Sequence, residues 1–86
     1  MKSILKVSIR QVKAARALLA WSQSDLARHS GVSEPTVKRL ESQDGELGGR
    51  ADTGDKIVAA LEAAGVIFQA EGETVDGGAG VRIRKD

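Results

Sequence analysis

The sequence has no cysteine, one proline and only two aromatic residues, Trp21 and Phe68. Without cysteine, the chain can form neither disulfides nor thiolate metal sites, and thiol catalysis is excluded. No apolar run approaches the roughly 20 residues that a membrane helix needs. The opening residues MKSILKVSIRQ mix charged with apolar side chains, unlike the core of a signal peptide. We therefore expect a soluble, cytoplasmic protein that does not act at a membrane.

A chain of 86 residues is long enough for one domain, which we expect to span residues 1–86. A domain of this size buries only about 60–65% of the surface that its unfolded chain exposes. A partner subunit would therefore add stability that the small core lacks.

Charge is unevenly distributed along the chain. The net charge is +1, but residues 1–43 carry eight Lys/Arg and three Asp/Glu, a balance of +5, which leaves −4 for residues 44–86. A basic half beside an acidic half is typical of a protein that meets phosphate on one side only.

The stretch SQSDLARHSGVSEPTVKRLE, residues 22–41, has the pattern of two short helices joined by a tight turn. Ser22 is placed to cap the first helix, and Gly31 can end it in left-handed geometry. Ser33 or Glu34 caps the second helix, in whose first turn Pro35 costs little. The spacing predicts helices over 23–30 and 34–43.

On the second of these helices, Val37 and Leu40 share one face at 100° per residue. The opposite, outward face consists of Pro35, Lys38, Arg39 and Ser42. An outward polar face of this kind predicts a partner, and the pattern as a whole predicts a helix-turn-helix.

The stretch also resembles the lambda-repressor-like (Cro/Xre) family. The shared positions are Gln23, Leu26-Ala27, Gly31-Val32-Ser33, Thr36-Val37 and Leu40-Glu41. The resemblance implies a small single-domain bacterial regulator with a compact four-helix fold. The loop LGGRADT and the ends LEAAGVIF and GAGVRIR look like those of small regulators of the same family.

Periodicity places the other elements. A helix is predicted over 8–20, because Ile9, Val12, Ala15 and Leu19 recur at helical spacing. Residues 1–7 are ambiguous between a frayed arm, an extra turn and a short strand. The glycine-rich segment 42–53 predicts a loop; its Gly48-Gly49 lacks the features of a phosphate-binding P-loop. A helix over 53–64, capped by Asp52 or Thr53, carries the stripe Ile57, Val58, Leu61 and Ala64.

Beyond Gly65 the period changes to that of strands, over about 66–71 and 81–85, which predicts a C-terminal β-hairpin on a mainly α fold. An isolated hairpin is marginal in water, so it must pack on the helices or extend across a two-fold axis. We favour the second arrangement, which predicts a homodimer formed through the hairpin.

The resemblance implies that the second helix of the motif enters the major groove of double-stranded DNA. Base-reading candidates, chosen for their side-chain chemistry, are Glu34, Pro35, Lys38 and Arg39. Arg39 can bond bidentately to guanine, Lys38 can reach guanine or phosphate, Glu34 can accept from cytosine, and Pro35 offers an apolar contact. Phosphate candidates are Ser22, Gln23, Thr36, Ser42 and Arg50. For Ser22, Gln23 and Ser42, the phosphate contact is what the resemblance implies. For each phosphate candidate, a helix cap or a solvated polar side chain is the alternative.

Three residues have predicted structural roles. Arg16 lies one turn after Val12, and the resemblance implies that it pairs with Glu41 and ties the first helix to the recognition helix. Trp21 is either a stacking platform for a base or a core anchor, and we favour the core.

Function follows from these assignments. His29 is the lone histidine, expected to be solvated, and no acid/base constellation stands near it, so we expect no enzyme, no metal and no cofactor. We expect a sequence-specific DNA-binding transcriptional regulator, a dimeric repressor that reads an inverted repeat. The alternative is an antitoxin or antiactivator that binds a toxin or activator protein on a helix-turn-helix scaffold.

Overall fold

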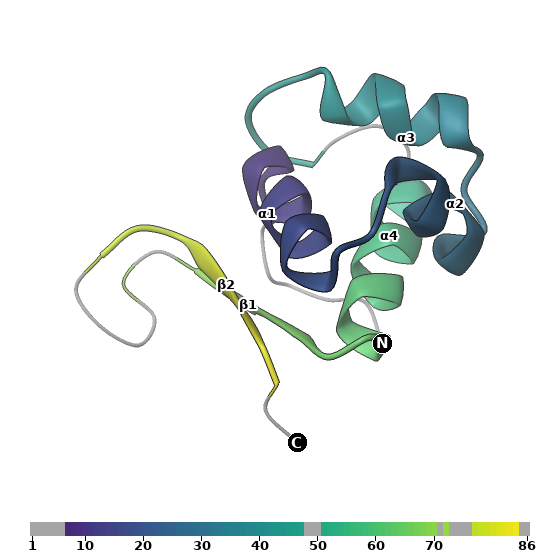
Figure 1. Cartoon of the computed structure of the whole chain (residues 1–86). Helices are drawn as coiled ribbons and strands as arrows, with labels where there is room; N and C mark the ends of the chain where they lie inside the picture. Colours follow the sequence, from purple (N-terminus) through teal and green to yellow (C-terminus); the bar gives the residue numbers. More distant parts are fainter. Residues whose placement is uncertain (1–6, 48–50, 71, 73–76, 85–86) are drawn as a thin grey trace.

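The computed structural model of the chain describes residues 7–47, 51–70, 72 and 77–84. This part of the chain forms helices α1 (Ile9–Leu19), α2 (Gln23–Ser30), α3 (Glu34–Glu41) and α4 (Ala51–Ala63), then strands β1 (Val66–Gln69) and β2 (Gly80–Ile83). Figure 1 shows the helices gathered into one body and the hairpin on its side. The predicted fold class, a mainly α helix-turn-helix fold with a C-terminal hairpin, is confirmed.

α1 begins at a capping box. The Oγ of Ser8 accepts a hydrogen bond from the N–H of Gln11 (3.1 Å), whose Oε1 accepts from the N–H of Ser8 (2.9 Å). The helix ends at Ala20, which is left-handed with φ 57°. α1 therefore lies one residue inside the predicted range at each end. Three residues of its apolar stripe, Ile9, Val12 and Ala15, are buried.

The turn between α2 and α3 has the predicted chemistry. Ser22 caps α2, and Gly31 ends it at φ 76°. Ser33, not Glu34, caps α3, and Pro35 lies in its first turn. α3 stops at Glu41 rather than at 43, because Ser42 forms the C-cap and its Oγ donates to the carbonyl of Arg39 at 2.7 Å.

The described segment after α3, residues 42–47, is a loop, as predicted, and it is tied to the start of α1. The loop was predicted to reach residue 53, but residues 51–53 belong to α4. The N–H of Ile9 donates to the carbonyl of Gly45, and the N–H of Leu47 donates to the carbonyl of Val7, both at 2.8 Å. Ser8 and Glu46 form an isolated antiparallel bridge. Of the ambiguous residues 1–7, only Val7 is described; it is buried in the core.

α4 begins at Ala51, so the prediction that Asp52 or Thr53 caps it was wrong. Both residues lie within the first turn, where an acidic or hydroxyl side chain is also favoured, and sequence alone does not separate the two positions. Its apolar stripe is as predicted, with Ile57, Val58 and Leu61 buried.

The hairpin pairs antiparallel with Val66 opposite Ile83 and Gln69 opposite Gly80. Its strands are shorter than predicted: β1 ends before Ala70, and β2 begins at Gly80 and ends before Arg84. Its inner face packs on α1 and α4 of the same chain, with Val66 and Phe68 buried. This is the first of the two expected arrangements, so the hairpin does not need a second subunit to bury its apolar face.

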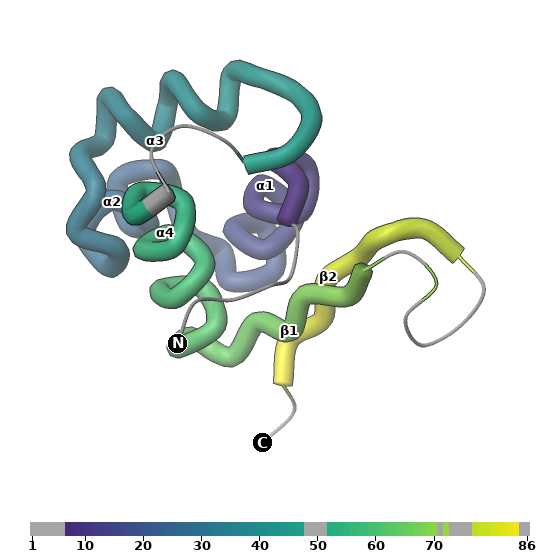
Figure 2. Tube along the Cα trace, turned by 180° about the vertical axis from the view of Figure 1, so that it is seen from behind, coloured from purple at the N-terminus to yellow at the C-terminus, as the bar shows by residue number. Residues whose placement is uncertain are grey.

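A single core joins every element. Its buried members include Val12, Ala15, Leu26, Val37, Leu40, Ile57, Leu61, Val66 and Phe68. Each fully buried large aliphatic side chain contributes roughly 1.5–3 kcal/mol relative to an exposed one. In Figures 1 and 2, α3 and the hairpin lie at opposite ends of this core, so the hairpin leaves the outward face of α3 uncovered.

Candidate nucleic-acid interface

The outward face of α3 is open to solvent. Pro35, Lys38, Arg39 and Ser42 are exposed, whereas Val37 and Leu40 point into the core. The Nζ of Lys38 lies 3.4 Å from Oε2 of Glu34, one turn earlier, in a largely exposed pair. Such a pair stabilises the helix little. The pair matters for DNA binding, because Glu34 and Lys38 must separate before either side chain can bond to a base.

Arg39 has no salt bridge within the described part of the chain. No ion pair among the described residues therefore has to break before its guanidinium bonds to a guanine. Among the four base-reading candidates, Arg39 is exposed, and its chemistry suits bidentate reading of a guanine.

The N-terminus of α2 carries two of the phosphate candidates. The exposed Ser22 closes a capping box with Asp25: its Oγ accepts from the N–H of Asp25 (3.0 Å), and Oδ2 of Asp25 accepts from the N–H of Ser22 (2.9 Å). That backbone hydrogen bond, aided by Arg28, holds the pKa of Asp25 below its ordinary value. Ser22 is therefore engaged as a helix cap in the free protein.

The half-buried Gln23, at the first residue of α2, is hydrogen-bonded to the end of α3. Its Nε2 donates to Oε1 of Glu41 at 3.0 Å. An amide nitrogen carries two N–H groups, so this bond leaves one of them for a phosphate. Glu41 thus fixes the orientation of the amide that we expect to meet DNA.

The other phosphate candidates lie apart. Thr36 is half-buried in the first turn of α3, and its Oγ1 accepts from the Oγ of Ser33 at 2.9 Å. The exposed hydroxyl of Ser42 is bonded to its own helix, as described above. Arg50 lies outside the described residues.

Arg16 and Glu41 form a bidentate ion pair at the centre of these elements. Arg16 Nε donates to Oε2 of Glu41, and Arg16 Nη2 donates to Oε1, both at 2.7 Å. Arg16 Nη1 also donates to the carbonyl of Trp21 at 2.9 Å. The pair therefore joins α1, the start of α2 and the C-terminal turn of α3, as the resemblance implied.

The electrostatics of the pair favour its ionised state. Burial alone would raise the pKa of Glu41, whose side chain is 4% exposed. Hydrogen bonds from Arg16 and Gln23, with the charges of Arg16 and Lys13, outweigh burial and hold the pKa of Glu41 below its ordinary value. The hydrogen bond to Glu41 likewise raises the pKa of Arg16, against the opposing effect of burial. Glu41 is thus a carboxylate at neutral pH.

Trp21 is half-buried and packs against the core. Its ring is stacked on that of His29, with centroids 4.2 Å apart and planes 5° from parallel. This geometry supports the core-anchor interpretation, because His29 covers one face that a base would need. His29 is exposed, as expected, but its contact with Trp21 gave no signal in the sequence.

Sequence reasoning missed Gln11, which is buried at 5% exposure on α1. Its Nε2 donates to the carbonyls of Gln69 (3.0 Å) and Gly80 (2.9 Å), the pair that closes the end of the hairpin. Ser8 and Gln11 have the S-x-x-Q spacing of a capping box, a signal from which the N-terminus of α1 could have been located. Nothing local could have indicated that the amide also holds β1 and β2.

Among the described residues, no three His, Asp or Glu side chains are grouped so that they could hold a metal ion. No described helix is both long and apolar enough to span a bilayer.

Comparison with known proteins supports the assignment of the motif. A family model described as Helix-turn-helix matches residues 12–50, which include most of α1 and all of α2 and α3. A comparison with curated proteins found no match. The matched family is one of DNA-binding regulators. The match supports a helix-turn-helix of the lambda-repressor-like family within residues 12–50.

Proposed function

We propose that the protein is a sequence-specific transcriptional regulator that binds double-stranded DNA through α3. The observation that carries this proposal is Arg39, which is exposed and has no salt bridge to a described residue, on the outward face of a helix whose other face is buried in the core. α3 would lie in the major groove, with Arg39 on a guanine and Lys38 on a guanine or a phosphate. Gln23, Ser22, Thr36, Ser42 and Arg50 would contact the DNA backbone.

The regulator would act as a dimeric repressor on an inverted repeat. Ile67 and Ile83 on the hairpin are each 40% exposed, which gives the hairpin apolar surface for a second copy. Two copies related by a two-fold axis would read half-sites about 34 Å apart. The molecule measures 36 × 28 × 26 Å, a width that suits this spacing when two copies lie side by side. A bacterial regulator of this kind would work in the cytoplasm.

The test begins with genomic fragments selected by the protein and measures their binding by fluorescence anisotropy over a salt series. Wild type should show a steep salt slope, a preferred sequence and two protein chains per inverted repeat. Arg39→Ala should lose about 1–3 kcal/mol of discrimination at one base pair of each half-site, because a bidentate contact is removed.

Lys56→Ala is the matched control. Lys56 is an exposed cation of α4, outside the helix-turn-helix, so this variant should keep the preferred sequence. If no fragment is enriched, or if Arg39→Ala selects like wild type, α3 does not read DNA. The search would then turn to a toxin or activator protein.

A further inference from the structure

The N-terminal half of α1 is fixed beside the C-terminal end of α3. The loop after α3 is hydrogen-bonded to Val7 and Ile9 through Leu47 and Gly45. Ser8 and Glu46 bridge the same two segments. These contacts, together with the Arg16–Glu41 pair, hold the first turns of α1 at a set place relative to the recognition helix.

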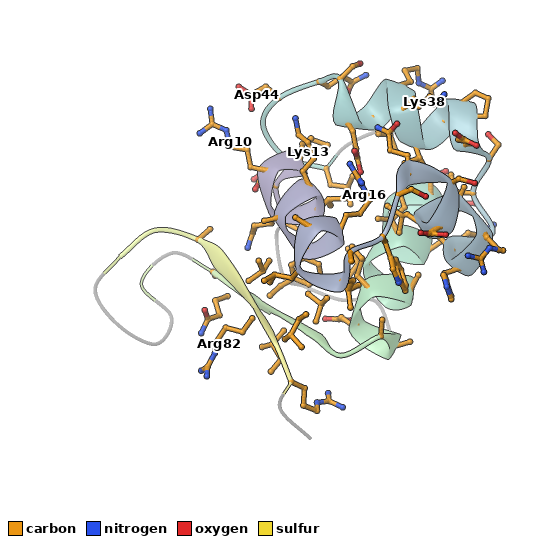
Figure 3. The ribbon with its side chains drawn as sticks, in the orientation of Figure 1. Arg10, Lys13, Arg16, Lys38, Asp44 and Arg82 are labelled. Carbon is orange, nitrogen blue, oxygen red and sulfur yellow. The ribbon has the colours of Figure 1, made fainter. Side chains whose placement is uncertain are left out.

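Two cations occupy this part of α1. Arg10 and Lys13 are both exposed, and Figure 3 shows them directed toward the side of the molecule on which α3 lies. Arg10 Nε lies 3.7 Å from Asp44 Oδ1, with the two side chains 84% and 79% exposed. A pair so long and so exposed is weak. Lys13 has no salt bridge within the described residues, although its charge helps to lower the pKa of Glu41.

The carboxylate of Glu41, which interacts with the charge of Lys13, does not cancel these cations. Glu41 is 4% exposed and bonded to Arg16 on both oxygens, so its charge is neutralised within the protein. Arg10 and Lys13 therefore present positive charge to solvent at the end of α3, with Asp44 as the only carboxylate paired with either of them among the described residues.

Geometry decides which part of a DNA duplex these cations would meet. An α-helix with its side chains is about 10–12 Å across, and the major groove is about 12 Å wide, so α3 would fill the groove. Arg10 and Lys13 belong to another helix, beside the end of α3. They would therefore lie over the rim of the groove, where the phosphates are, and not over base edges.

We infer that Arg10 and Lys13 form a phosphate-binding surface that grips the DNA backbone beyond the C-terminal end of α3. In the free protein Arg10 is weakly paired with Asp44, and on DNA binding it exchanges this carboxylate for a phosphate. This inference rests on the proposed function, in which α3 lies in the major groove, and it adds a contact made by α1 to those of α2 and α3.

The salt dependence of DNA binding tests this inference, because each phosphate contact releases counterions from the DNA. It is measured with the full-length protein and the selected DNA fragment. Each phosphate contact adds about 0.9 to the magnitude of the slope of log K against log salt. Lys13→Gln and Arg10→Gln should each reduce the slope by about 0.9, equivalent to roughly eightfold weaker binding at 0.1 M salt. The loss should be the same on the preferred and on a scrambled sequence, since phosphates carry no sequence.

Lys56→Gln is the matched control. Lys56 is an exposed cation of α4, outside the helix-turn-helix and outside the hairpin, so its removal should leave the slope unchanged. Lys13→Arg keeps the charge and should keep the wild-type slope, which separates a lost contact from a damaged fold.

Two results would overturn the inference. Slopes for Lys13→Gln and Arg10→Gln equal to that of Lys56→Gln would show no contact, while selective binding by wild type would leave the proposed function standing. A loss confined to the preferred sequence would mean base reading instead. Absence of DNA binding by wild type itself would remove the proposed function and this inference together.

Discussion

Arg16 is the side chain on which the packing of α1 against α3 depends most. Removing it would leave the carboxylate of Glu41, 4% exposed, without its bidentate partner. Breaking a buried pair in this way costs about 3–5 kcal/mol, and the 20% exposure of Arg16 places the expected loss near 3 kcal/mol. Urea unfolding of Arg16→Ala measures it.

Arg28→Ala is the control for that variant. Arg28 pairs with Asp25 at 2.8 Å, but the arginine is 66% exposed, so its removal should cost less than about 1 kcal/mol. If the two variants lost the same free energy of unfolding, or if the urea midpoint of Arg16→Ala were unchanged, the Arg16–Glu41 pair would stabilise the fold no more than an exposed pair does.

Glu41 also predicts how stability depends on pH. Its pKa in the folded protein lies below the ordinary value of 4.5, so the folded state favours the carboxylate. The stability from this group is complete above about pH 4.5 and is lost as the pH falls through the lower, folded pKa. In Glu41→Gln the free energy of unfolding should fall less steeply with acidification.

The same acid titration separates Glu41 from Asp25, whose pKa is also lowered. Because the side chain of Asp25 is 35% exposed, against 4% for Glu41, Asp25→Asn should alter the acid slope less than Glu41→Gln does. An acid slope in Glu41→Gln equal to that of wild type would contradict the assigned direction.

Residue roles were predictable from the sequence only where a local pattern or a family position marked them. Arg16 stood out because a charge on an apolar stripe needs a partner, and the resemblance supplied Glu41. The contact of Gln23 with Glu41 was not predictable, since nothing in the spacing of the two residues requires it. The stack of His29 on Trp21 likewise depends on how α2 meets the end of α1 in space.

At the scale of elements, helix ends with a strong local signal were predicted best. Ser22, Gly31, Ser33 and Pro35 act through hydrogen bonds and backbone preferences within a few residues, and α2 has the predicted bounds. The start of α4 was misplaced because hydroxyl and acidic residues suit both a cap and a first turn. The hairpin ends depend on Gln11, which lies 58 residues before Gln69.

Gln11 therefore gives a prediction for the hairpin as a unit. Gln11→Met keeps a similar shape but removes three hydrogen bonds: those to the carbonyls of Gln69 and Gly80, and the one that Oε1 accepts from the N–H of Ser8. At roughly 1 kcal/mol for each bond, the free energy of unfolding should fall by about 3 kcal/mol. Amide hydrogen exchange should quicken in β1 and β2 before it does so in α2 and α3. Equal acceleration throughout the chain would show that Gln11 does not hold the hairpin in particular.

At the scale of the whole molecule, the proposed DNA-binding surface and the proposed dimer surface are on different elements. α3 lies at one end of the core, and the hairpin lies at the other with its inner face packed on α1 and α4 (Figure 1). A second copy could therefore bind at the hairpin without covering Arg39. Sedimentation equilibrium of the free protein at micromolar concentration decides whether this dimer exists without DNA.

The central claim is that Arg39 reads a guanine in the major groove. A double-mutant cycle tests it most directly, pairing Arg39→Ala with replacement of single guanines in the selected site by 7-deazaguanine, which lacks the N7 acceptor. At one guanine of each half-site, either change alone should weaken binding, and the two together should weaken it hardly further, with a coupling of about 1–3 kcal/mol. Additive losses at every guanine would contradict the claim.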